Sequence, residues 1–209
     1  MLDEIRTLSR TFIDLRFQKY QRYFIKNNEL DHRFSIILGD RGIGKTTTLV
    51  QYLMQYANGD SLSSKILYVQ SDHILVRPLS LYAIAEEFYT LGGKFIAFDE
   101  IHKYADWSIE LKSITDTFPQ LKILASGSSA LEIHKGSHDL SRRAIVYQMT
   151  GLSFREYLEM KLNITFTPLT LDELLIEHET VATRIIKRIN QKKSKVLALF
   201  QDYLRWGYY

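Results

Sequence analysis

The fold is decided by the stretch Gly39-Asp40-Arg41-Gly42-Ile43-Gly44-Lys45-Thr46-Thr47. Gly39 and the closing Gly44-Lys45-Thr46 meet the pattern G-x-x-x-x-G-K-[ST]. In this pattern, glycines let backbone N–H groups point inward, where a side chain would collide with a phosphate. The pattern predicts that the nine residues bind a nucleoside triphosphate. Lys45 is expected to reach its β- and γ-phosphates, and Thr46 to bind the accompanying Mg²⁺.

The residues on either side of this loop agree with that interpretation. Residues 34–38 form a short apolar run that predicts a strand, and 45–56 have the apolar spacing of a helix that ends at Asn58-Gly59. The alternative is a chance glycine-rich turn. A strand before the loop and a helix after it are, however, the context that a phosphate-binding loop requires.

Apolar runs of strand length alternate with helical patterns up to about residue 150, without an internal repeat. Such alternation predicts an α/β fold of the P-loop NTPase type, with a five-stranded, mainly parallel sheet between helices. The further strands are expected at 65–70, 95–98, 121–125 and 144–149, and the helices at 2–25 (one or two), 78–91, 107–117 and 130–135.

A second motif is predicted where the strand at 95–98 runs into Asp99-Glu100. An aspartate in this position holds Mg²⁺, usually through water, and Glu100 would polarise the attacking water. Two surface acids at a strand end are the alternative, and their location and order argue against it. Because the strand at 65–70 lies in sequence between the loop and Asp99, we expect an additional strand between the two motif strands in the sheet. That arrangement is typical of NTPases with a catalytic glutamate.

The strand pattern stops near Gly151, and we expect a domain boundary there. Residues 1–150 are predicted to form a P-loop ATPase core with a helical lead-in at 1–33. Residues 151–209 are predicted to form a helical lid or the start of a second domain. Helices are expected there from Ser153, which begins a capping box with Glu156, from Asp172, and over 195–206.

Composition places the chain among ordinary globular proteins, with 45% hydrophobic and 24% charged residues. The net charge of +3 is too small to imply nucleic acid by itself. No stretch approaches the ~18 apolar residues of a membrane span, and the N-terminus lacks a secretory signal. The absence of cysteine excludes disulfides and thiolate metal sites. We therefore expect a cytoplasmic protein.

Basic residues cluster between residues 181 and 201, where no acidic residue occurs. The favoured interpretation is the solvated face and end of a helix, where cations also interact with the helix dipole. A nucleic-acid surface is the alternative, and it lacks the interleaved aromatic residues that stack on bases. The basic residues are Arg184, Lys187, Arg188, Lys192, Lys193 and Lys195.

Four segments together resemble a known family, the prokaryotic AAA+-type ATPases, most of which are known only as ATP-binding proteins. The segments are DEIHKYADW (99–107), LKILASGSSALEI (121–133), DLSRRA (139–144) and GLSFREYL (151–158). The similarity covers about residues 16–158. The end of the chain, FQDYLRWGYY (200–209), resembles that family's F-x-E-Y-L-x-x-G-G-Y-P segment. Family members continue well beyond it, so we expect this chain to lack a C-terminal domain.

The resemblance implies further site residues. Ser126 or Ser128, at the end of the fourth strand, would sense the γ-phosphate, with Ser126 favoured. Arg143 would act as an arginine finger in the site of a neighbouring subunit, which implies a homo-oligomer, and Arg142 beside it is an extra arginine. Ordinary surface arginines are the alternative.

Three aromatic or imidazole side chains have two possible interpretations each. Tyr20 and Tyr23 would flank the adenine, although core packing is the favoured interpretation. His102 completes a D-E-x-H tetrapeptide like that of helicases. The other helicase motifs are missing, so we interpret His102 as a local structural residue.

The expected function is Mg²⁺-dependent ATP hydrolysis. Hydrolysis by an isolated core should be slow, since an arginine from a neighbour is worth about 10³–10⁵ in rate. The alternative is a switch or scaffold, in which bound ATP or ADP sets the conformation and turnover is incidental. A DNA-handling ATPase is a third candidate, supported only by the basic residues of 181–201. The sequence names no protein partner.

Overall fold

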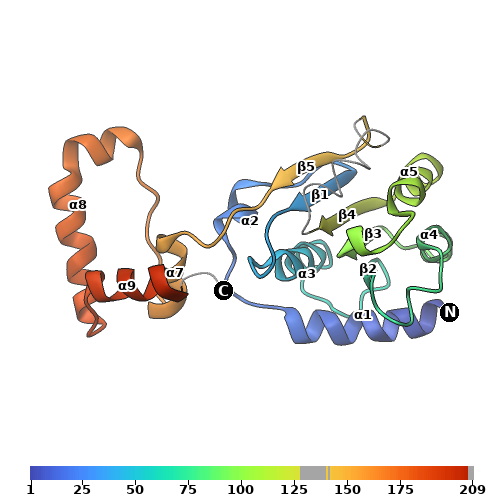
Figure 1. The fold of residues 1–209 in the computed structure, drawn as a ribbon, viewed down its shortest axis with the longest axis horizontal. Helices are drawn as coiled ribbons and strands as arrows, with labels where there is room; N and C mark the ends of the chain where they lie inside the picture. The colour runs from blue at the N-terminus through green and yellow to red at the C-terminus, as the bar shows by residue number, and fades with distance from the viewer. Residues whose placement is uncertain (128–139, 141, 207–209) are drawn as a thin grey trace. The chain divides into compact units, whose positions relative to one another are not determined.

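The computed structural model describes residues 1–127, 140 and 142–206. The chain divides into two compact units, Met1–Thr150 (unit 1) and Gly151–Tyr209 (unit 2). Unit 1 contains a five-stranded sheet in which all neighbouring strands are parallel, in the order β2-β3-β4-β1-β5 (Figure 1). The strands are β1 (Phe34–Leu38), β2 (Ile66–Gln70), β3 (Phe95–Asp99), β4 (Lys122–Gly127) and β5 (Ile145–Gln148).

The strand order corrects one expectation. An additional strand does lie between the two motif strands β1 and β3, but it is β4, whereas the strand at 65–70, β2, lies at the sheet edge beside β3. The reason is that consecutive β-α-β crossovers place β2, β3 and β4 side by side, so the chain makes its long step between β1 and β2. The order of the strands in the sequence therefore did not predict their order in the sheet.

Helices cover both faces of the sheet, because successive strand residues point to opposite sides. In β2, Leu67 and Val69 join the apolar cluster that includes α4 (Leu81–Thr90) and α5 (Trp107–Thr117). Their neighbours Ile66 and Tyr68 join the cluster that includes α3 (Lys45–Tyr56). Both clusters are buried, so the sheet is the centre of a three-layer unit.

The N-terminal helix α1 (Leu2–Arg16) packs along the edge strand β2. The Ser9 hydroxyl accepts a hydrogen bond of 2.8 Å from the backbone N–H of Tyr68, so α1 satisfies a donor on the sheet edge. A second, short helix, α2 (Tyr23–Asn27), precedes β1. The predicted lead-in therefore consists of two helices.

Most predicted elements of unit 1 are confirmed. β1, α3 and α5 have the predicted bounds, and Ser80 caps α4 by accepting a hydrogen bond from Ala83 N at 3.2 Å. A short 3-10 helix, η1 (Ile101–Lys103), follows β3. The helix predicted at 130–135 lies outside the described residues.

Unit 2 consists of helices α7 (Phe154–Leu162), α8 (Leu171–Gln191) and α9 (Val196–Trp206) in its described part. The predicted capping box of Ser153 and Glu156 is present. A second capping box, made by Thr170 and Glu173, begins α8, so this helix starts just before the predicted Asp172. The buried core of the unit is Leu158, Phe166, Ile189 and Leu199.

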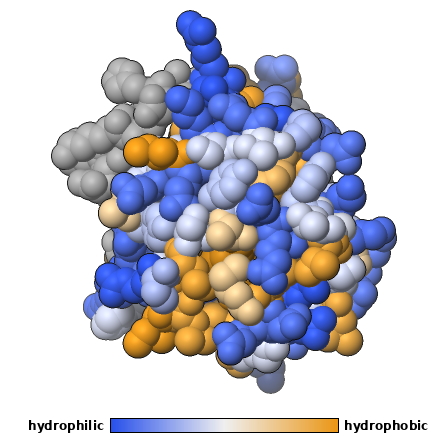
Figure 2. All heavy atoms as spheres, turned by 90° about the vertical axis from the view of Figure 1, so that its right-hand side faces the viewer, coloured by the Kyte–Doolittle hydropathy of each residue, from blue (hydrophilic) through white to orange (hydrophobic). Residues whose placement is uncertain are grey.

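The surface of unit 1 is mixed in character. Figure 2 shows the side with α4 and α5, where hydrophilic residues (blue) are interspersed with hydrophobic ones (orange). Within the described ranges, no helix is both long enough and apolar enough to cross a membrane.

Candidate nucleotide-binding site

The glycine-rich loop connects the end of β1 to the start of α3. Gly42 and Gly44 have φ values of +85° and +97°, in the left-handed region that glycine adopts without strain. The N–H groups of residues 44–47, at the start of α3, donate no hydrogen bond to any acceptor in the described part of the chain. Unpaired donors at a helix N-terminus, together with the helix dipole, favour a bound phosphate.

Lys45 supplies the loop with a buried cation. Its side chain is 5% exposed, and Nζ donates to the carbonyl oxygens of Gly39 and Asp40, at 2.8 and 2.6 Å. Burial lowers the pKa of Lys45, and the nearby negative charges of Glu100, Asp99 and Asp40 act in the opposite direction. The ammonium group lies across the loop, so a phosphate bound there would meet this charge.

Asp99, at the end of β3, is fixed by four donors and is only 2% exposed. Its Oδ2 accepts hydrogen bonds from the Thr46 and Tyr68 hydroxyls, both at 2.6 Å. Its Oδ1 accepts from the Ser126 hydroxyl and, at 3.1 Å, from the Glu100 N–H. The contact with Thr46 brings together the two motifs predicted from the sequence.

Mg²⁺ fits this pair of residues. In the part of the chain that the structure describes, no group of three or more His, Cys, Asp or Glu residues is arranged to hold a metal ion. Mg²⁺ does not need such a cage, because it binds through one or two carboxylates, phosphate oxygens and water. The Thr46 hydroxyl and the Asp99 carboxylate offer hard oxygen ligands within 2.6 Å of each other.

Of the side chains that donate to Asp99, the sequence predicted Ser126 as a site residue but not Tyr68. Ser126, predicted as a γ-phosphate sensor, is buried in β4, where its oxygen also accepts from the Glu100 N–H at 3.3 Å. Ser128 lies outside the described residues. Tyr68 was missed, since in the apolar run of β2 it reads as a core aromatic. Burial and the charge of Asp99 raise the pKa of Tyr68, so its hydroxyl stays a hydrogen-bond donor.

Glu100 follows directly with an unusual backbone. Its φ is +55°, a conformation that residues other than glycine adopt rarely and that recurs at functional sites. The side chain is 23% exposed, with Oε2 at 3.2 Å from Lys103 Nζ and 3.7 Å from His102 Nε2. His102 therefore lies beside the predicted catalytic carboxylate.

Arg143 lies just before β5 and pairs with Asp116 of α5. Its Nε and Nη2 donate to the two carboxylate oxygens at 2.7 and 2.9 Å. Sequence reasoning could not find this partner, because the residues are 27 positions apart and meet only through the fold. Arg142, the neighbouring arginine, is exposed.

The lead-in also reaches the loop. Arg22 Nη1 donates to the carbonyl oxygens of Ile43, in the loop, and Thr150, at 2.8 and 3.0 Å. No sequence signal singled out this residue. Tyr20 and Tyr23 are partly buried, and Lys26 Nζ lies 5.6 and 4.9 Å from their ring centroids.

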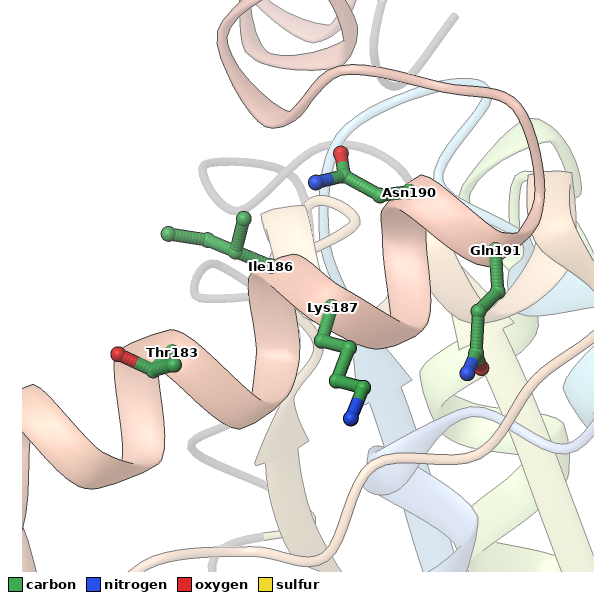
Figure 3. Close-up of a pocket in the computed structure, with 5 residues that line it drawn as sticks. All are labelled: Thr183, Ile186, Lys187, Asn190 and Gln191. Carbon is green, nitrogen blue, oxygen red and sulfur yellow. The ribbon is translucent and has the colours of Figure 1, made fainter.

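A separate hollow lies along α8 in unit 2. Figure 3 shows its side chains extending from successive turns of that one helix, among them Ile186 and Lys187. The six basic residues of 181–201 are all exposed. The hollow has none of the loop geometry of unit 1. Its remaining lining residues are Thr183, Asn190 and Gln191.

Comparisons with known proteins agree with the fold. Residues 31–158, more than half of the chain, match a family model described as an AAA domain. An uncharacterised protein of Methanocaldococcus jannaschii is 29% identical over 205 residues, which are 93% of this chain and 41% of that protein. The chain therefore spans less than half the length of this relative.

A solved structure shares the fold at low sequence identity. The Saccharomyces cerevisiae Hsp104–ADP complex matches 75% of this chain and 28% of its own, with a TM-score of 0.50 and 14% identity. Caenorhabditis elegans PCH-2 matches 82% of this chain and 50% of its own, with a TM-score of 0.47 and 17% identity. The chain belongs to the AAA domain family, and its core is that of an AAA+-type P-loop ATPase.

Proposed function

We propose that unit 1 binds ATP with Mg²⁺ across Gly39–Thr47 and hydrolyses it. The observation that carries this proposal is the 2.6 Å contact between Thr46 and Asp99, which joins the phosphate-binding loop to the strand end that precedes Glu100. A loop that only bound phosphate would need neither the carboxylate nor the glutamate beside it. Together they supply the parts of phosphoryl transfer to water.

Each residue then has a definite task. The N–H groups at the start of α3 and the Lys45 ammonium bind the phosphates, while Thr46 and Asp99 hold Mg²⁺, which neutralises phosphate charge when bound. Glu100 orients a water molecule and accepts its proton. Positioning and charge stabilisation of this kind account for most of the catalysis in such sites. Ser126 contacts both the Asp99 carboxylate and the Glu100 N–H, and so fixes their positions relative to each other.

We propose that Arg143 links ATP hydrolysis to the association of chains. A guanidinium that enters a neighbour's site must leave Asp116, with which it now makes two hydrogen bonds. We therefore propose that turnover by single chains is slow and rises when chains associate. We propose that residues 151–209 form a helical lid. Movement of this lid would be the conformational change that ATP hydrolysis drives.

The second candidate is a switch in which ATP or ADP sets conformation with little turnover. The pairing of Arg143 with Asp116 favours it, because this pairing occupies the arginine that would accelerate hydrolysis. Nucleotide that copurifies with the chain, without phosphate release on prolonged incubation with Mg²⁺, would support this candidate. A DNA-handling role would use the exposed basic residues between residues 181 and 201.

The test compares Glu100→Gln with the parent chain and with Glu86→Gln, a matched change of an exposed acid on α4. Glu100→Gln should bind MgATP with parent affinity by calorimetry. Its rate of phosphate release should fall by about 10²–10⁴, the usual contribution of a general base. Glu86→Gln should retain the parent rate. Parent-like turnover by Glu100→Gln would remove Glu100 from the mechanism, and a parent chain without ATP affinity would refute the proposed function.

A further inference from the structure

Lys103, in η1, lies between two carboxylates next to the proposed catalytic site. Its Nζ is 2.6 Å from Asp72 Oδ2 and 3.2 Å from Glu100 Oε2. Asp72 follows β2 and is itself held by Gln70, whose Nε2 donates to Asp72 Oδ1 at 2.8 Å. A chain of side-chain contacts therefore runs from the end of β2 to Glu100.

The sheet anchors the Asp72 end of this series of side-chain contacts. Gln70 is paired with Asp99 in the register of β2 and β3, and the Ser71 N–H donates to the Asp99 carbonyl oxygen at 3.0 Å. The hydrogen bond to Asp72 raises the pKa of Lys103. Partial burial acts to raise the pKa of Asp72, but the hydrogen bonds from Lys103 and Gln70 outweigh it and lower that pKa. Both groups are therefore charged at neutral pH.

At the other end of this series of contacts, Glu100 is held at one carboxylate oxygen, Oε2. Both neighbours, the Lys103 ammonium and the His102 imidazole, lie nearest to Oε2, whereas Oε1 makes no hydrogen bond within the described residues. Lys103 also places a positive charge between the carboxylates of Asp72 and Glu100, which follow adjacent strands.

We propose that Lys103, anchored by Asp72, is the positioning residue of Glu100: it holds Oε2 and leaves Oε1 to accept the proton of the attacking water. The inference rests on the proposed function, because Glu100 has a proton to accept only if ATP is hydrolysed. Within the described residues, neither Lys103 nor Asp72 makes a hydrogen bond or ion pair with the phosphate-binding loop. Their effect should therefore appear in turnover and not in nucleotide affinity.

The test is steady-state ATP hydrolysis by the full chain. Lys103→Met should lower kcat about tenfold or more, as small misplacements of a catalytic group do, with KM for ATP nearly unchanged. Lys103→Arg should retain more activity, since it keeps the charge. Lys65→Met, which removes an exposed lysine at the other end of β2, should behave like the parent. Asp72→Asn, nearly isosteric, should lower kcat in the same direction by a smaller factor.

A double variant separates positioning from other effects. If Lys103 acts through Glu100, then Glu100→Gln and Glu100→Gln/Lys103→Met have the same residual rate. Undiminished kcat in Lys103→Met, or a rise in KM alone, overturns the inference and leaves the proposed function standing. A further loss in the double variant also overturns it. Absence of turnover in the parent refutes both. Should Lys103→Met not fold, as judged by its thermal unfolding, an unchanged kcat in Asp72→Asn is the result that overturns the inference.

Discussion

Tyr68→Phe removes a single buried oxygen from the environment of Asp99. The Tyr68 hydroxyl donates to Asp99 Oδ2 at 2.6 Å, and a hydrogen bond to a charged group contributes about 1.5–3 kcal/mol to stability. Asp99 keeps its other three donors, so its carboxylate is not left unpaired, and the lower part of that range applies. The free energy of unfolding should therefore fall by about 1.5–2 kcal/mol. For a chain of this size the melting temperature should fall by about 3–8 °C.

The same variant should weaken Mg²⁺ binding, because one of the groups that orient Asp99 is lost. The Mg²⁺ concentration needed for half-maximal binding of a fluorescent ATP analogue should rise about tenfold, a typical effect of removing a residue that orients a metal ligand. Tyr52→Phe is the matched control: the Tyr52 hydroxyl donates at 2.6 Å to a neutral acceptor, the carbonyl oxygen of Asn28. It should cost about 1 kcal/mol and leave the Mg²⁺ titration unchanged.

Two results would refute this reasoning. One is a Tyr68→Phe variant that is no less stable than Tyr52→Phe. The other is a Mg²⁺ titration of Tyr68→Phe that coincides with that of the parent. Either would mean that the other donors alone orient Asp99.

The remaining predictions concern the loop and Arg143. Lys45→Ala should abolish or greatly weaken ATP binding while the circular dichroism spectrum persists, since the loop glycines remain; unchanged affinity by calorimetry in a folded variant contradicts this. Gly39→Ala should weaken ATP binding and lower the melting temperature, because its Cβ would collide with the Met149 carbonyl oxygen. A variant that matches the parent in both measurements disproves the close approach. Mixing Lys45→Ala chains with Arg143→Ala chains at high concentration should restore some hydrolysis. No gain over either variant alone argues against an arginine supplied between subunits.

The strongest sequence predictions rested on local patterns. The bounds of β1, α3 and α5 follow from short-range apolar spacing and turn residues, which the sequence contains in full. The meeting of Thr46 with Asp99 also follows locally, since the loop after one parallel strand and the end of another share one edge of the sheet. Motif and context together were sufficient to bring these two residues together.

The misses have a different physical origin. The place of β4 depends on which strands the crossover helices bring together, and nothing in β4 itself encodes its neighbours. Tyr68 reaches Asp99 only because β2 and β3 are neighbours that pair in one register. Lys103 stood in a recognised motif, but its partner Asp72 lies 31 positions away. Each of these contacts is long-range, and one sequence carries no direct signal for it.

The position of α1 bears on which residues the candidate nucleotide site needs for its support. The family match starts at residue 31, which leaves α1 and α2 outside it. Yet Ser9 satisfies the Tyr68 N–H, the Phe12 ring lies 5.8 Å from the Tyr68 ring, and Tyr68 in turn supports Asp99. A chain trimmed to the residues of the family match would keep every motif residue and lose the support behind one of them. The start of the family match and the start of the candidate nucleotide site, as its contacts define it, therefore differ by the helices α1 and α2.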